Sequence, residues 1–277
     1  VNGLSIGSGG DPIYAYNRLS GGSIRMYSFE NGAWTDTKDT YDPTQKENGG
    51  FTGTLVAGAV NLSNDKYMFG GFETTDHGRG ANPRYTQVFK VWQYDPAASP
   101  KFVYKGYMET YSGQSEPGGA NGDMAFDASG SLYAVRGTGN TTSIFSVTAQ
   151  NINAANGGKI TTASSKEFRT ITGVNGVAFD ADGKAYLGSS SQVVSYDMPD
   201  WTNEKTVVSS NYSGTDLASC SSPATITIEK DVVGGRVNDE DQFHMTLTQG
   251  QTLLGEATTT GTAAGTQAER IGPLPTA

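Results

Sequence analysis

Short stretches in which apolar and polar residues alternate, separated by turn-forming residues, run through the first 220 or so positions of the chain. Three of them align without gaps. Each starts with Ala and an apolar residue, continues with Asp or Asn and a turn cluster, and reaches Tyr eight positions after the Ala, at 59–67, 125–133 and 178–186. Asp and Asn hydrogen-bond their own backbone, and Gly accepts a positive φ. The pattern therefore predicts a strand, a tight turn and a second strand in each copy.

Each predicted hairpin is followed by two more strand-like stretches. The third stretch of each unit is rich in β-branched and aromatic residues, which is typical of strands. These stretches are 23–29, 87–94, 143–147 and 192–196. A weaker fourth stretch follows near 35–40, 102–108, 167–171 and 205–209. Four strands per unit, repeated at intervals of 40 to 66 residues, predict the blades of a β-propeller.

Two further copies of the unit lie at the ends of this region. Val1-Asn2-Gly3-Leu4 is similar to residues 174–177, and Thr215-Asp216-Leu217-Ala218 is similar to residues 122–125. The last copy has only its first strand before Pro223. One terminus of a propeller completes the blade of the other, which removes exposed sheet edges. We therefore expect about five blades, the last incomplete, in a chain that is a fragment of a longer protein.

The residues after Pro223 differ in pattern from the repeats. Residues 224–233 alternate like a strand, 234–241 read as a turn, 242–248 as a second strand, and the Thr-rich stretch from 251 continues the pattern. This is typical of the first half of a small β-sandwich. The predicted fold class is all-β, with a β-propeller-like array of four-stranded blades over 1–222 and a partial, truncated β-sandwich domain over 223–277.

Composition narrows the classes of partner. The formal net charge is −9 and the isoelectric point is about 4.7, whereas binding of nucleic acid phosphates requires clustered Lys and Arg. No run approaches the roughly 20 apolar residues of a membrane-spanning helix. We expect a monomer that binds no nucleic acid, inserts no part of this region into a membrane and carries no cofactor or metal.

Two carboxylates are the strongest candidates for chemistry. Asp123 and Asp216 occupy equivalent positions in two copies of the repeat, so both could face the central channel. Paired carboxylates at a common opening would suit an enzyme that acts on polysaccharides. Ala57 and Gly176 occupy this position in other copies. The Asp-rich turns 127–131 and 180–184 offer fewer oxygen ligands than calcium requires, which favours ordinary hairpin turns.

The longest insertion within a blade is a candidate ligand-binding loop at residues 73–81. Loops on a rigid scaffold often carry binding residues. The alternative is a solvated loop without a function. The candidate binding residues in and beside this loop are Glu73, His77, Arg79, Arg84 and Tyr85.

Two single residues suggest covalent cross-links. Cys220, the only cysteine, lies where the ring of blades would close, so its disulfide partner could lie on a strand upstream of Val1. The alternative is a buried free thiol. Lys230, on the first strand of the predicted sandwich, could form an isopeptide bond with an Asn if burial kept its amine deprotonated. The alternative is an exposed lysine on a strand.

The chain resembles secreted, cell-wall-anchored surface proteins of Gram-positive, actinobacterial type. The segments that carry this resemblance are 1–4, 121–127, 174–180 and 215–220. Residues 223–247 resemble the start of a prealbumin-like or pilin B-type repeat, with Lys230 and Phe243 at the matching positions. The resemblance implies an exported propeller displayed on a stalk of β-sandwich repeats, with an anchoring signal at the C-terminus of the parent protein.

Three functions remain open at this point. The first is a non-catalytic display or adhesion module that binds an extracellular glycan or a host or matrix protein. The second is a lyase or hydrolase that acts on polysaccharides, which would require the channel carboxylates to be accessible. The third is a purely structural domain at the tip of a stalk.

Overall fold

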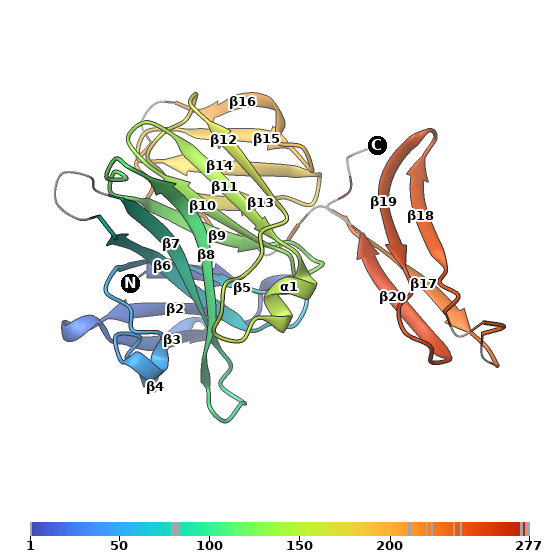
Figure 1. The fold of residues 1–277 in the computed structure, drawn as a ribbon. Helices are drawn as coiled ribbons and strands as arrows, with labels where there is room; N and C mark the ends of the chain where they lie inside the picture. Colours follow the sequence, from blue (N-terminus) through green and yellow to red (C-terminus); the bar gives the residue numbers. More distant parts are fainter. Residues whose placement is uncertain are drawn as a thin grey trace.

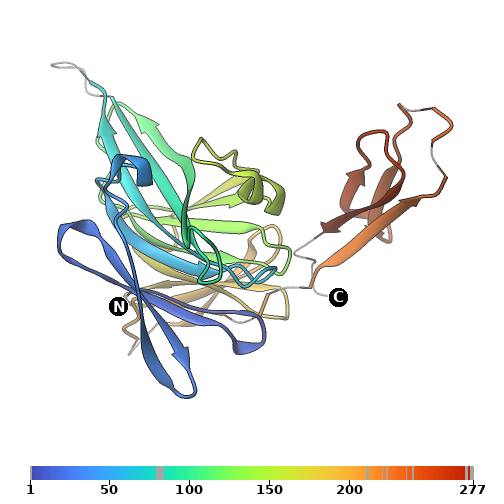
Figure 2. The ribbon, with the colours of Figure 1, turned by 90° about the horizontal axis from the view of Figure 1, so that it is seen from below.

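The computed structural model describes residues 2–78, 84–209, 212–219, 221–222, 224–234, 236–238, 240–271 and 274, except the side chain of Arg270. The chain forms two lobes (Figures 1 and 2). The larger lobe contains strands β1 to β16, and the smaller contains β17 to β20. Within the described residues, no helix has the length and apolar character needed to cross a bilayer.

The larger lobe consists of four antiparallel sheets of four strands each, and each sheet follows chain order from its first to its last strand. Blade 1 contains β1 (Asn2–Ile6), β2 (Ile13–Arg18), β3 (Ile24–Glu30) and β4 (Ala33–Tyr41). Blade 2 contains β5 (Thr54–Val60), β6 (Tyr67–Asp76), β7 (Tyr85–Tyr94) and β8 (Phe102–Gly113). Blade 3 contains β9 (Asn121–Phe126), β10 (Leu132–Gly137), β11 (Thr142–Val147) and β12 (Ser164–Phe168). Blade 4 contains β13 (Val174–Phe179), β14 (Lys184–Ser189), β15 (Val193–Asp197) and β16 (Thr202–Val208).

The first strands of the four blades lie side by side. β1 contacts β5, β5 contacts β9, and β9 contacts β13. Three apolar cores fill the spaces between consecutive blades, and aromatic residues dominate the one between blades 1 and 2. Inner strands around a common axis, with sheets packed face to face, make this a β-propeller-like fold. The predicted all-β fold class is confirmed.

The repeated hairpin turns have the predicted structure. Asp180 Oδ1 accepts a hydrogen bond from Lys184 N at 2.9 Å, and Asp180 Oδ2 accepts one from the Tyr186 hydroxyl at 2.7 Å. Asp127 makes the equivalent bonds in blade 3. These carboxylates therefore hold the turns, and the described residues contain no cluster of three acidic, histidine or cysteine side chains that could hold a metal ion.

Blade 3 differs from the prediction near its fourth strand. A short helix, α1 (Ala149–Ala154), precedes β12, and the Thr148 hydroxyl accepts a hydrogen bond from Asn151 N at 3.2 Å to cap it. Ile152 on this helix is fully buried in the core between blades 2 and 3. The fourth strand ends at Phe168 instead of continuing to about 171.

A segment after blade 4 closes the ring. Residues 212–219 occupy the place of a fifth inner strand but form no strand there. Asn175 Nδ2 in blade 4 donates to Gly214 O at 3.3 Å, and Leu217 packs over Gly176 and Gly188. A Cβ atom at Gly176 would lie 2.8 Å from Leu217. Glycine at this position therefore admits the closing segment.

The smaller lobe has two antiparallel strand pairs. β17 (Ile226–Val232) pairs with β20 (Gly265–Ile271), and β18 (His244–Gln249) pairs with β19 (Thr252–Thr258). This agrees with the alternating pattern of the sequence. Val232, Thr259 and Ile271 are its buried side chains among those described.

Candidate functional site

The two carboxyl groups predicted to face the channel come together at the centre of the ring. Asp123 on β9 is buried, and Oδ2 accepts a hydrogen bond from Val177 N of blade 4 at 2.9 Å. Asp216 on the closing segment accepts one from Leu4 N of blade 1 at 3.2 Å. The two carboxyl groups lie close enough for the charge of Asp216 to act on Asp123, whose Oδ1 is buried without a hydrogen-bond partner among the described residues. The two backbone contacts thus join blade 3 to blade 4 and the closing segment to blade 1.

The two carboxyl groups affect each other's ionisation. Burial raises the pKa of Asp123 well above its usual range, and the neighbouring charge of Asp216 raises it further. Burial also raises the pKa of Asp216, to about 6, while the hydrogen bond that it accepts from Leu4 N acts in the opposite direction. Asp123 therefore keeps its proton to a higher pH than Asp216 does.

Side-chain oxygens join the inner strands at two other points. Ser5 Oγ in blade 1 accepts a hydrogen bond from Val60 N in blade 2 at 2.7 Å. Ser219 Oγ on the closing segment accepts one from Phe179 N in blade 4 at 3.1 Å. The inner strand is the free edge of each sheet, so its outward N–H groups need acceptors from the neighbouring blade.

The channel has almost no free space at this level. A cavity of about 10 Å³ lies among residues of β1, β5, β9, β13 and the closing segment. That is room for at most one water molecule. The Tyr67 hydroxyl reaches from blade 2 to the neighbouring blade 1 and donates to Gly3 O at 2.5 Å, which is possible because Gly58 has no side chain in its path.

The predicted binding loop is a long hairpin between β6 and β7. His77 N donates to Arg84 O at 2.6 Å, and the His77 ring lies 2.8 Å from Thr86 Oγ1. His77 and Arg84 are exposed, and Tyr85 is half-buried. Burial followed by the charge of Asp76 raises the pKa of Tyr85. Arg79 lies outside the described residues.

Glu73 has a different role from the one expected of a loop residue. Its Oε1 lies 2.9 Å from Lys90 Nζ, with only 12% and 11% of the two side chains exposed, and its Oε2 accepts a hydrogen bond from Thr52 N at 2.7 Å. These contacts hold blade 2 together. The sequence did not indicate them because Lys90 lies on the neighbouring strand.

A buried arginine that no sequence motif indicates lies near the loop end of the β6–β7 hairpin. Arg136 on β10 is only 6% exposed, and its Nε donates to Gln87 Oε1 on β7 at 2.5 Å. Gln87 Nε2 donates in turn to Thr74 Oγ1 at 2.9 Å. The guanidinium carbon lies 5.7 Å from the centre of the Tyr111 ring. We call Arg136, Gln87, Thr74, Tyr111 and the cross-strand neighbour Ser143 the arginine corner.

Neither candidate cross-link is tested by the described residues. Cys220 lies outside the described residues, so its disulfide remains a prediction. Lys230 Nζ lies 4.6 Å from the centre of the Phe243 ring, and the Arg236 guanidinium lies 5.5 Å from the same ring. Among the described residues, no carboxylate or Asn side chain forms a hydrogen bond or ion pair with the Lys230 amine. The isopeptide bond also remains a prediction.

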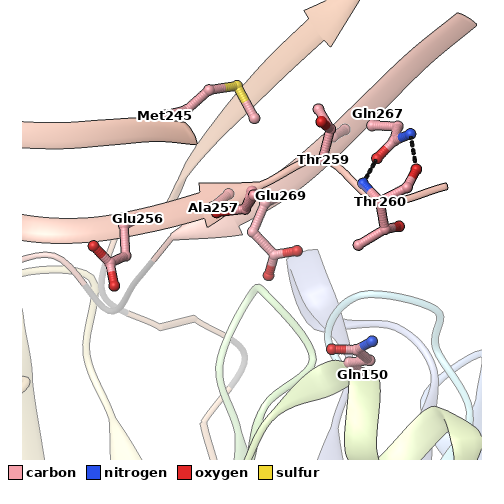
Figure 3. Close-up of a pocket in the computed structure, with 10 residues that line it drawn as sticks. Gln150, Met245, Glu256, Ala257, Thr259, Thr260, Gln267 and Glu269 are labelled. Carbon is pink, nitrogen blue, oxygen red and sulfur yellow. Dashed lines mark hydrogen bonds between the residues drawn. The ribbon is translucent and has the colours of Figure 1, made fainter. Parts of the chain in front are cut away.

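A hollow of about 580 Å³ lies between the smaller lobe and Gln150 of α1 (Figure 3). Glu256 and Glu269 line it, and the side chain of Gln267 is fixed by two hydrogen bonds of 2.7 Å to the backbone of Thr260. The larger lobe contributes only Gln150 to the lining. The remaining lining residues all belong to the smaller lobe.

Comparisons with known proteins find one sequence family and several solved structures that are similar to parts of the chain. A sequence family described as a prealbumin-like fold domain matches residues 225–277. No curated protein matches the chain. Apo AztD from Citrobacter koseri is 12% identical over 78% of this chain and 49% of its own, with a TM-score of 0.37. The Nup133 β-propeller domain of Vanderwaltozyma polyspora is 11% identical over 74% and 55%, with a TM-score of 0.41.

A third solved structure is the SapL1 lectin in complex with alpha methyl fucoside. It is 10% identical to this chain over 75% of this chain and 79% of its own, with a TM-score of 0.37. The chain spans about half the length of AztD and of the Nup133 domain. The family match lies in the smaller lobe, which is therefore a prealbumin-like domain. In the chain this domain follows a β-propeller-like array of four-stranded sheets.

Proposed function

We propose that the chain is a non-catalytic display and binding module at a cell surface. The propeller-like lobe presents loops to an extracellular glycan or a host or matrix protein, and the prealbumin-like domain supports it as part of a stalk. The proposal includes secretion and attachment to the cell wall of a Gram-positive bacterium. Its support is the resemblance of the repeats, the family match at 225–277 and the separate position of the smaller lobe in both views (Figures 1 and 2).

The arrangement of Asp123 and Asp216 is the observation that favours binding over catalysis. Glycosidases keep their two carboxyl groups about 5 to 9.5 Å apart, with a sugar or a water molecule between them. Here Asp123 is buried, and each of the two carboxyl groups accepts a backbone N–H from another blade. One oxygen of each carboxyl group therefore helps to close the ring.

The test uses the whole chain on arrays of glycans and matrix proteins, together with an assay for new reducing ends or unsaturated sugars. We expect a specific ligand and no turnover. Turnover that is lost in an Asp123→Asn variant, with the fold preserved, would support the enzyme instead. Arrays without any bound ligand would favour the purely structural role.

A further inference from the structure

The position of Arg136 follows from the alternation of β10. Leu132 and Ala134 point into the apolar core between blades 2 and 3, while Tyr133 and Val135 point into the core between blades 3 and 4. Arg136 lies two residues after Ala134, so its side chain is on the same face of β10 as those of Leu132 and Ala134. Its side chain therefore extends from the end of an apolar core toward β7 of blade 2, where Gln87 meets it.

The geometry around Arg136 fixes the guanidinium in one orientation. Arg136 Nε donates a hydrogen bond to Gln87, and Gln87 in turn donates one to Thr74. A β-bulge on β8 brings Tyr111 directly opposite Gln87, on the face that meets the arginine. The Tyr111 hydroxyl donates to Ser115 O at 2.8 Å, so the ring under the guanidinium is itself fixed.

This arginine forms no ion pair with any described residue. Buried charges in proteins are ordinarily paired, because an unpaired one loses its hydration without compensation. The carboxylate whose charge acts most on Arg136 is that of Glu167, which is exposed and lies 3.0 Å from Arg169. Burial lowers the pKa of Arg136, yet a guanidinium stays protonated at any physiological pH.

The terminal nitrogens of Arg136 remain available to a ligand. They form no hydrogen bond with any described residue, and they are absent from the set of fully buried atoms without a partner. The small exposed part of the side chain thus gives them access to solvent. Arg236 in the smaller lobe differs, because its Nε and Nη2 are sealed from solvent.

We propose that the arginine corner binds the carboxylate of an acidic sugar. An arginine fork pairs with a planar carboxylate through two parallel hydrogen bonds. The other members of the corner are an amide, two hydroxyls and an aromatic ring, which suit sugar hydroxyls and the apolar face of a sugar ring. A single arginine on a chain of net charge −9 fits an isolated carboxylate better than a polyanion. This inference rests on the proposed binding function and names the class of its ligand.

The test measures binding of methyl glucuronide to the whole chain, with methyl glucoside as the neutral match. We expect the glucuronide to bind and the glucoside to bind at least tenfold more weakly. Arg136→Gln should reduce glucuronide affinity at least tenfold. The matched control is Lys205→Gln, which removes an exposed positive charge on blade 4 and should leave the affinity unchanged.

Gln87→Glu keeps the test decisive if Arg136→Gln fails to fold. The new carboxylate would lie beside Arg136 Nε and supply an ion-pair partner inside the protein. We expect this variant to melt at the same or a higher temperature and to lose glucuronide binding at least tenfold. Unchanged affinity in a folded Gln87→Glu variant would overturn the site, as would wild-type protein that does not bind the glucuronide.

Two further outcomes separate this inference from the proposed function. Equal binding of a short oligoglutamate peptide would overturn the assignment to acidic sugars. An array ligand whose binding is insensitive to both substitutions would overturn the arginine corner and leave the display function standing. Arrays and glucuronide titrations that are all negative would contradict both.

Discussion

Asp216 and Leu4 are 212 positions apart in the chain, yet the carboxylate of Asp216 accepts a hydrogen bond from the backbone N–H of Leu4 at 3.2 Å. This contact joins the segment after the last blade to the first strand of the first blade. The charge of the same carboxyl group acts on the buried Asp123 and raises its pKa. Closure of the propeller-like lobe therefore involves two acids that affect each other's ionisation.

The stability of this lobe should fall as the pH rises toward neutrality. Burial raises the pKa of Asp216 from 3.8 to about 6 in the folded chain, and that of Asp123 is raised further. The folded state thus keeps protons that the unfolded state has already lost. The contribution of the pair is fully present below pH 3.8 and is lost as the pH rises through about 6. For Asp216 this corresponds to about 3 kcal/mol.

Urea unfolding at about pH 5 and about pH 7.5 measures this loss. Asp123→Asn should reduce it, because the amide does not titrate and can still accept from Val177 N. Asp182→Asn, at an exposed turn position, should keep the wild-type dependence on pH. The role of the carboxyl pair would be contradicted if Asp123→Asn and wild type lost the same stability.

Ser219→Ala should weaken the contact between the closing segment and blade 4. The substitution leaves Phe179 N without its acceptor at 3.1 Å, and a buried N–H without a partner costs about 1–3 kcal/mol. Hydrogen exchange at the Phe179 amide should accelerate, and the free energy of unfolding should fall. Ser213→Ala, at an exposed position of the same segment, should change neither. Equal effects of the two substitutions would mean that the Ser219 bond does not hold the segment.

The stability effects of substitutions at Gly58 and Tyr67 should be non-additive. Tyr67→Phe removes the donor to Gly3 O and should cost about 1–3 kcal/mol. Gly58→Ala places a Cβ atom 1.9 Å from the Tyr67 hydroxyl and should destabilise the lobe at least as much. Because both changes remove the same contact, the double variant should be more stable than the sum of the two costs predicts.

Chemical unfolding of the four chains in the Gly58 and Tyr67 cycle gives the coupling energy. Gly119→Ala is the matched control, because a Cβ atom there would meet no other atom within 4 Å. Strictly additive costs would show that Tyr67 reaches Gly3 independently of Gly58.

The blades could be predicted from the sequence because their contacts are local. Asp180 holds Lys184 N and the Tyr186 hydroxyl, both within six residues, so the turn chemistry is visible in one short segment. The helix α1 was missed although Thr148 is a capping residue, because six residues of helix give too short a periodic pattern.

The central pair could be predicted only in part. The equivalence of Asp123 and Asp216 in the repeats placed both at the ring, but the bonds that they accept from Val177 N and Leu4 N depend on how the blades pack. Arg136 was missed for a similar reason. Its alternation with Leu132 and Ala134 is visible in the sequence, whereas the lack of a carboxylate partner depends on side chains of the neighbouring blade.

Phe243 in the prealbumin-like domain should contribute more to stability than its exposure suggests. Two cations lie over its ring, Lys230 Nζ at 4.6 Å and the Arg236 guanidinium at 5.5 Å, and Arg236 has two buried nitrogens without a partner. Phe243→Leu keeps an apolar side chain but removes both cation–π contacts, for an expected loss of about 1–2 kcal/mol. Hydrogen exchange in β17 and β18 of the whole chain measures it. Leu253→Ala, at an exposed position of β19, should cost less, and a larger effect there would show that the ring does not hold the two cations.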